Sequence, residues 1–157
     1  MPEEAPAARA RPKVLLAFDF GMRRIGVACG DTVSGNASPL GSVTVGPAGV
    51  RWDRIDALMR DYRPALLIVG LPYNTDGSES DAARRARDFA AELAAHYALP
   101  VDLVDERYSS LEAEARLKDE RAAGLRRRRV TKSDVDAGAA CVILERWLGR
   151  SALGDDT

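Results

Sequence analysis

The first apolar run of the chain covers residues 14–20, and a second run over residues 25–29 follows it after a short turn. Continuous apolar runs of this length predict buried strands, and two of them joined by a tight turn predict a hairpin. Residues 37–45 are apolar at fewer positions and contain Pro39 and Gly41, which predicts a weaker third strand. Three consecutive strands with short connections predict an antiparallel meander.

Strands and helices alternate through the middle of the chain. Apolar residues at helical spacing predict a helix over residues 52–62, which ends before Pro64. The apolar run ALLIVG at residues 65–70 predicts a strand that is buried on both faces. A helix over residues 80–98 and a short strand over residues 101–105 are predicted next. Because a helix separates these two strands, we expect them to be parallel, with a right-handed crossover.

The last third of the chain holds two predicted helices joined by a basic loop. The first helix is predicted over residues 109–119. The second helix is expected to begin at Ser133 as its cap, and it is apolar over most of its surface. Between them, residues 121–132 carry a glycine and four consecutive arginines with little to pack, which indicates a mobile loop. We therefore expect a flexible arm at 1–12, one α/β domain at 13–150 and a flexible tail at 151–157.

Composition indicates a single soluble domain. The 157 residues are 46% hydrophobic and 30% charged, and no apolar run approaches the ~20 residues of a membrane span. The N-terminal residues lack the apolar centre of a signal peptide, so we expect a cytoplasmic protein. Cys29 and Cys141 lie in apolar stretches, and we interpret them as small buried side chains rather than as a disulfide or a metal site.

Charge is distributed unevenly along the chain. The net charge is −1, but residues 116–132 hold eight basic and two acidic side chains. Arginine pairs bidentately with phosphate, so this basic segment favours contact with a nucleic-acid backbone. A solvated loop without a ligand is the alternative, and the two are compatible because a flexible segment can become ordered on a substrate.

Three acidic residues stand at positions where the predicted fold does not need a charge. Asp19 lies inside the first strand between two phenylalanines, where an ionised carboxylate is costly unless it is paired or bound to metal. Glu106 follows the last predicted strand in the sequence DER, at a strand end of the kind that binds ligands in α/β sheets. Asp136 lies in the first turn of the last helix, on a face that we expect to be partly buried.

Each of these acids also has a structural interpretation. Asp19 could accept backbone hydrogen bonds within the folded protein. Glu106 could be a surface acid that pairs with Arg107 or Arg23. Asp136 could stabilise the N-terminus of its helix by interacting with the helix dipole. Asp105 and Asp134 compete for the roles of the second and third acids.

Taken together, the acids favour a metal-dependent nuclease. Three carboxylates brought together repel one another and stay ionised only with cations between them. Oxygen ligands suit Mg²⁺ or Mn²⁺, no His and Cys cluster exists for zinc, and the single histidine, His96, falls on a solvated helix. Carboxylates that hold two cations ~4 Å apart activate water and stabilise the leaving oxygen of a phosphodiester.

Four stretches in order, DFGMRRIGVACGD, LIVGLPYNTDGSES, DERYSSLEAE and DVDAGAACVILERWL, resemble the YqgF (RuvX) family of Holliday-junction resolvase-like nucleases. The resemblance covers about residues 15–148. It implies a ribonuclease H-like fold, an α/β fold with a five-stranded mixed sheet in the order 3-2-1-4-5 and helices on both faces. It also implies an acidic, metal-binding and catalytic site at Asp19, Glu106 and Asp136.

The resemblance implies a nucleic-acid substrate, because family members are associated with maturation of the 5′ end of pre-16S rRNA and some with junction resolution. We favour single-stranded RNA, with pre-ribosomal particles as a partner, since tyrosines that flank the site can stack on unpaired bases. Branched DNA is the alternative, and a four-way junction would favour a homodimer over a monomer. The residues expected to contact the substrate are Arg23, Arg24, Tyr73, Asn74, Arg107, Tyr108, Arg126, Arg127, Arg128, Arg129 and Lys132.

Two other function classes fit parts of the sequence. DFGMRRIGV also looks like the first phosphate loop of the actin and sugar-kinase group, but those nucleotide-binding proteins need two such lobes, and 157 residues supply one. A non-catalytic RNA-binding module of ribosome assembly would use the basic segment alone. Retention of all three acids argues against that module.

Overall fold

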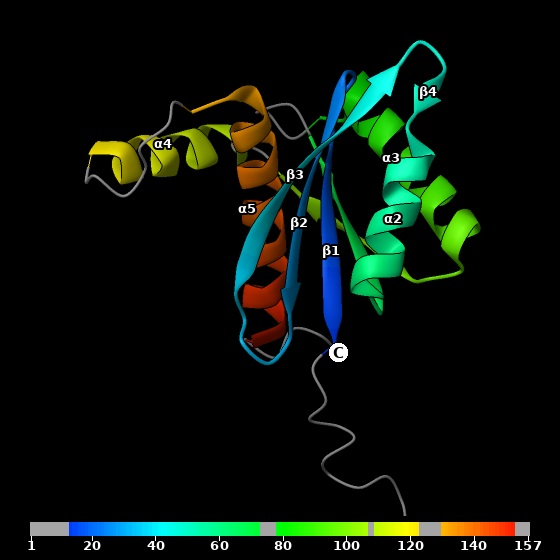
Figure 1. Ribbon diagram of the computed structural model, residues 1–157, viewed down its shortest axis with the longest axis horizontal. Coiled ribbons are helices and arrows are strands. Elements are labelled where there is room, and N and C mark those ends of the chain that lie inside the picture. Colours follow the sequence, from blue (N-terminus) through cyan, green and yellow to red (C-terminus); the bar gives the residue numbers. More distant parts are fainter. Residues whose placement is uncertain (1–12, 73–77, 107–108, 123–129, 153–157) are drawn as a thin grey trace, which may run out of the picture.

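The computed structural model describes residues 13–72, 78–106, 109–122 and 130–152 (Figure 1). The arm expected at 1–12 lies outside the described residues. The C-terminal helix continues to Ala152, so the expected tail is helical at its first two residues and otherwise lies outside the described part. Of the basic loop expected at 121–132, residues 121, 122 and 132 are helical, and residues 123–129 lie outside the described part.

A six-stranded mixed sheet in the order β4-β3-β2-β1-β5-β6 forms the centre of the molecule. β1 pairs antiparallel with β2, β2 with β3 and β3 with β4, whereas β1, β5 and β6 run parallel to one another. The strands are β1 (Val14–Phe20), β2 (Arg24–Asp31), β3 (Ala37–Gly46), β4 (Gly49–Val50), β5 (Leu66–Leu71) and β6 (Val101–Asp105).

The prediction of five strands was wrong by one edge strand. The meander was expected to end with the strand over residues 37–45, but the chain turns back on itself and β4 adds two residues to the edge of β3. The turn is possible because Gly49 adopts φ +101°, a backbone conformation that glycine reaches without strain. The order of the other five strands is as predicted.

Helices cover both faces of this sheet (Figure 1). α2 (Trp52–Tyr62) and α3 (Asp81–Tyr97) lie on one face, and α5 (Lys132–Ala152) lies on the other, with α4 (Ser109–Ala122) beside its first half. Side chains alternate between the two faces along each strand. In β1, Leu16 and Phe18 pack with the α2 and α3 core, and Leu15 and Ala17 pack toward α5.

The N-terminus of α5 is capped differently from the prediction. Thr131, not Ser133, is the capping residue, because its Oγ1 accepts a hydrogen bond from the backbone N–H of Asp134. The carboxylate of Asp134 accepts a bond from the backbone N–H of Thr131 in return, which completes a capping box. Ser133 lies inside the helix, and its hydroxyl is 3.1 Å from that of Ser42 on β3.

The two cysteines have free thiols, as predicted. Cys141 is buried and Cys29 is partly buried, and burial raises the pKa of both thiols. Of the helices in the described ranges, none is long and apolar enough to cross a membrane.

Candidate functional site

Asp19 lies on the face of the sheet that α5 covers. It is two residues beyond Ala17 on β1, and Ala17 packs toward α5, so the alternation of the strand points both side chains to the same face. Asp19 is partly exposed at the end of the strand. Its carboxyl group is nevertheless largely screened from solvent by the surrounding protein. This burial is the main cause of a raised pKa at Asp19, and the charge of Asp136 raises the pKa further.

Two glycines on the neighbouring strands make room around Asp19. Gly26 lies directly opposite Asp19 in the β1–β2 ladder, and a Cβ at Gly26 would overlap the backbone carbonyl of Asp136 on α5. Gly70, near the end of β5, would carry a Cβ that overlaps Ile143 and lies 3.1 Å from the Cβ of Glu106. The absence of these two side chains lets the other two acids approach the strand acid from either side.

Glu106 is held at the end of β6 by the sheet itself. Its backbone N–H donates to the carbonyl of Leu71 at 3.0 Å, so the parallel β5–β6 ladder continues one residue beyond the strand. The residue is 6% exposed, and its Oε1 is a buried oxygen without a hydrogen-bond partner among the described residues. Burial, then the charge of Asp19 and a hydrogen bond to it, raise the pKa of Glu106 far above that of a free carboxyl.

Asp136 reaches the same place from the first turn of α5. Its carboxylate is 20% exposed and forms an ion pair with Arg24, whose Nε donates to Oδ2 at 2.5 Å. Partial burial at this helix position is as predicted. The proposed competitor Asp134 is occupied in the capping box of α5.

The structure therefore brings the three predicted acids together from β1, β6 and α5. Within the described residues, no three His, Cys, Asp or Glu side chains stand close enough to hold a metal ion in this arrangement. In this arrangement Asp136 is bonded to Arg24, and Glu106 faces the charge of Asp19. Their joint role as metal ligands stays a prediction.

Arg146 is a site neighbour that the sequence reasoning missed. Its Nη1 donates to the backbone carbonyl of Asp105 at 2.9 Å, and its positive charge acts to lower the pKa of Glu106. The available signal was a single arginine inside the apolar stretch CVILERWL of the last helix. A basic residue there indicates an acidic or carbonyl partner on the packed element.

The predicted substrate residues are only partly described. Arg23 is exposed in the turn between β1 and β2, Lys132 is exposed at the start of α5, and Arg24 is bonded to Asp136. The remaining residues lie outside the described part, and these are Tyr73, Asn74, Arg107, Tyr108, Arg126, Arg127, Arg128 and Arg129.

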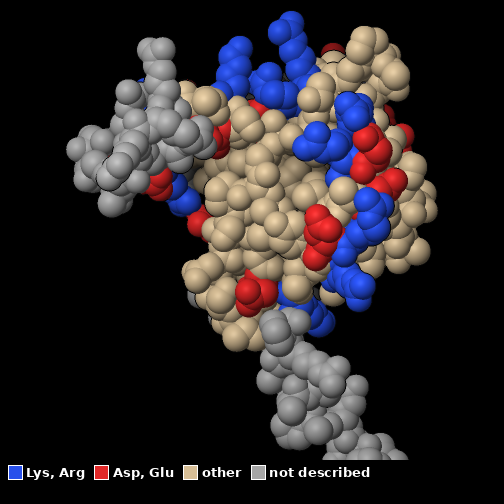
Figure 2. Space-filling model, viewed as in Figure 1, with Lys and Arg blue, Asp and Glu red and all other residues tan. Residues whose placement is uncertain are grey.

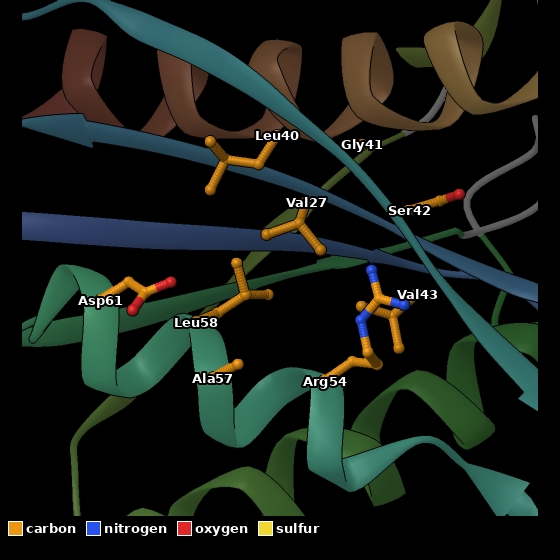
Figure 3. A pocket seen from close by; sticks show the side chains of 9 residues that line it. All are labelled: Val27, Leu40, Gly41, Ser42, Val43, Arg54, Ala57, Leu58 and Asp61. Atoms are coloured by element: carbon orange, nitrogen blue, oxygen red, sulfur yellow. The ribbon is translucent and has the colours of Figure 1, made fainter.

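A cavity of about 180 Å³ lies on the other face of the sheet and does not belong to this site. Figure 3 shows it between β3 and α2, with Leu40 and Leu58 along its wall and Arg54 and Asp61 on the helix. α2 also carries acidic residues among its arginines, and Figure 2 shows basic and acidic side chains side by side on that part of the surface. This surface has no uniform positive charge to compete with the basic segment before α5.

Residues 13–150 match the RuvX family, described as Holliday junction resolvase. A protein of Xanthomonas campestris pv. campestris (strain B100), named "Putative pre-16S rRNA nuclease", is 46% identical over 149 residues, which are 94% of each chain. A protein of Edwardsiella ictaluri with the same name is 42% identical over 136 residues, covering 87% of this chain and 94% of its own.

Two solved resolvases share the fold. Thermus thermophilus RuvC, in a complex with Holliday junction substrate, covers 90% of this chain and 96% of its own with a TM-score of 0.52 and 16% identity. The yeast mitochondrial Holliday junction resolvase Ydc2 covers 88% and 78%, with a TM-score of 0.50 and 10% identity. The likeness confirms the expected ribonuclease H-like fold. The family match over 13–150 and the similarity to these relatives show that the chain belongs to the RuvX family.

Proposed function

We propose that this protein is a divalent-cation-dependent nuclease in which Asp19, Glu106 and Asp136 bind Mg²⁺ or Mn²⁺. The observation that carries the proposal is the convergence of three carboxyl groups from three separate elements onto one end of the sheet. The nuclease names of relatives that are 42% and 46% identical support the same activity.

The donor set fits a hard divalent cation. All three side chains offer carboxylate oxygens, which Mg²⁺ and Mn²⁺ prefer over nitrogen and sulfur. Oε1 of Glu106 is buried without a partner among the described residues, and a protein rarely leaves a buried polar atom unsatisfied without a functional reason. A bound cation would satisfy that oxygen and would offset the repulsion that, after burial, raises the pKa of Asp19 and Glu106.

The chain itself positions the acids for this chemistry. When bound, divalent cations activate water and neutralise the leaving oxygen of a phosphodiester. Asp19 is fixed on the central strand, and Gly26 and Gly70 let Asp136 and Glu106 approach it. Arg146 holds the carbonyl of Asp105 and so steadies the strand end that carries Glu106. In the arrangement described, the guanidinium of Arg24 balances part of the negative charge through its ion pair with Asp136.

The proposed substrate is single-stranded RNA during 5′-end processing of pre-16S rRNA, in the cytoplasm and on pre-ribosomal particles. The names of the relatives support this substrate, and the basic segment before α5 suits a phosphate backbone. Tyr73 and Tyr108 are proposed to stack on unpaired bases. The family description as Holliday junction resolvase favours branched DNA as the second candidate substrate. A resolvase would act as a dimer, whereas RNA processing is compatible with a monomer.

The decisive experiment replaces each acid by its neutral isostere. Asp19→Asn, Glu106→Gln and Asp136→Asn should each lower cleavage by at least ~10²-fold, because each change removes a negative ligand. Cleavage is measured with Mg²⁺ and with Mn²⁺ on single-stranded RNA, single-stranded DNA and a four-way junction. Circular dichroism confirms that the variants remain folded.

Asp61→Asn is the matched control, since it makes the same charge change at an exposed residue of α2 on the other face of the sheet. Its cleavage rate should equal that of the unmodified protein. Full activity in Asp19→Asn would contradict the proposed site. Preference for the four-way junction over RNA would favour the second substrate.

A further inference from the structure

We propose that Arg24 is an exchangeable counter-ion of the site. Its guanidinium neutralises Asp136 while no cation is bound, and moves from Asp136 to a substrate phosphate when a cation occupies the acids. The inference rests on the proposed function, because it takes Asp136 to be a cation ligand.

The geometry puts Arg24 between the acidic site and solvent. It is the first residue of β2, two positions before Gly26, so both residues belong to the face that α5 covers. Its Nε donates to Oδ2 of Asp136 at 2.5 Å, across 112 residues of sequence. The arginine side chain is 36% exposed, and the Asp136 carboxylate is 20% exposed. The guanidinium therefore has an open side toward which it can move.

The fold does not depend on this ion pair. A partly exposed ion pair contributes only about 0–1 kcal/mol, because solvent screens the charges. α5 is anchored instead by buried apolar contacts of Ile143 and Leu144 with Leu15 and Ile68. Breaking the ion pair between Arg24 and Asp136 would leave that packing in place.

Cation binding and the ion pair exclude each other. A divalent cation on the Asp136 carboxylate would compete for the oxygen that Arg24 occupies and would repel the guanidinium. Arg146, the other basic residue beside the acids, donates to the backbone carbonyl of Asp105. The released guanidinium would lie at the end of the sheet that carries the acids, and it can hold a phosphate bidentately.

The first test measures Mn²⁺ binding by calorimetry without nucleic acid, so that it does not depend on activity. Arg24→Gln removes the competitor and should tighten Mn²⁺ binding by up to about 5-fold, corresponding to the ~0–1 kcal/mol of the pair. Arg24→Lys keeps the charge but loses the Nε donor, and should give an intermediate affinity. Arg54→Gln makes the same charge change on α2, on the opposite face, and should leave the affinity unchanged.

The second test follows the unmodified protein and so cannot be lost to misfolding. The Nε–H resonance of Arg24 is recorded by NMR during a titration with Mg²⁺. Its signal should move from a hydrogen-bonded to a solvent-exposed position as the cation binds.

In steady-state cleavage of RNA at saturating Mg²⁺, Arg24→Gln should raise KM by about 10-fold and change kcat less, because glutamine cannot pair with a substrate phosphate as arginine does.

The outcomes separate the two proposals. If the unmodified protein binds no Mn²⁺, or if Asp19→Asn binds it equally well, the proposed metal site itself is wrong. If Mn²⁺ binds through the acids but Arg24→Gln binds it equally or more weakly, the exchange is wrong and Arg24 is a structural partner of Asp136. An Arg24 resonance that does not respond to Mg²⁺ leads to the same conclusion.

Discussion

Asp19 and Gly26 face each other across the β1–β2 ladder, and the missing side chain of Gly26 is what lets the backbone of α5 rest on the sheet beside Asp19. A methyl group at Gly26 would overlap the carbonyl of Asp136. We expect Gly26→Ala to lower the free energy of unfolding by about 2–3 kcal/mol, as over-packing does in well-packed cores. Urea denaturation measures the change.

Gly149→Ala is the control for that substitution. Gly149 lies in α5, and a Cβ there meets no atom within 4 Å, so the change adds helix propensity without crowding. It should raise the free energy of unfolding by up to ~1 kcal/mol. A Gly26→Ala protein as stable as the unmodified one would show that α5 can move away from the sheet without cost.

Glu106 should make the stability of the metal-free protein depend on pH. Burial raises the folded-state pKa of Glu106 above the unfolded value near 4.5. Its contribution to folding stability is therefore complete below about pH 4.5, and it is lost as the pH rises from there toward the folded-state pKa. Glu106→Gln cannot ionise. In EDTA it should match the unmodified protein near pH 4 and be more stable at pH 8, with a gap that grows by at most ~1.4 kcal/mol per pH unit.

Thermal unfolding between pH 4 and pH 8.5 measures this gap, and Glu92→Gln on the exposed face of α3 is the matched control. A gap of constant size over that range would mean that Glu106 is ionised in the folded protein without metal. Added Mg²⁺ should narrow the gap, because cation binding favours the ionised carboxylate.

The capping box of α5 should separate the two aspartates near the helix start. Asp134→Ala removes the acceptor for the backbone N–H of Thr131 and should cost about 1 kcal/mol of stability. Because that carboxylate is used in the cap, Mn²⁺ affinity should stay within about twofold. Asp136→Asn should do the reverse, with a large loss of Mn²⁺ affinity and a small change in stability. Weakened Mn²⁺ binding in Asp134→Ala would make Asp134 a ligand.

The arginine run before α5 should set the salt dependence of substrate binding. Changing Arg126–Arg129 to glutamine should weaken RNA binding and reduce the slope of log K against log salt by up to ~0.7 for each phosphate that is no longer neutralised. Fluorescence anisotropy with labelled RNA between 50 and 300 mM salt, in EDTA, measures the slope. Mn²⁺ affinity should not change.

A second fourfold variant tests whether charge alone is responsible. Arg51, Arg54, Arg60 and Arg63 lie in or next to α2, on the face opposite the acids, and their change to glutamine alters the net charge equally. That protein should keep its salt slope. An equal reduction of the slope in both variants would indicate attraction by overall charge rather than a local interaction with phosphate.

The sequence predicted the fold well where one apolar pattern decides an element. The runs at β1 and β5 allow only buried strands, and Asp19 stands out because it interrupts such a run. β4 was missed because two residues carry no periodicity, and it depends on the positive φ of Gly49. Ser133 was preferred as the cap on local pattern alone, whereas the reciprocal bonds of Thr131 and Asp134 depend on the backbone position.

The site was predictable by residue type but not by interaction. The motifs identify three acids, and in the structure Glu106 and Asp136 lie near enough to Asp19 to act on its pKa. The contacts around those acids are long-range: Arg24 bonds to Asp136, and Arg146 donates to the backbone carbonyl of Asp105, next to Glu106. No local pattern in the sequence encodes them. Arg24 was expected to contact the substrate because its long-range partner could not be identified from the sequence. In the structure its described partner is Asp136.

The outer edge of β3 has a consequence for the behaviour of the protein at high concentration. Among the described strands, only β4 pairs with that edge, and it reaches only Val45 and Gly46. Pro39 offers no N–H, and Gly41, with φ +108°, lies where the ladder with β2 shifts register. A second sheet would find an interrupted row of donors there, so this edge resists aggregation by strand addition.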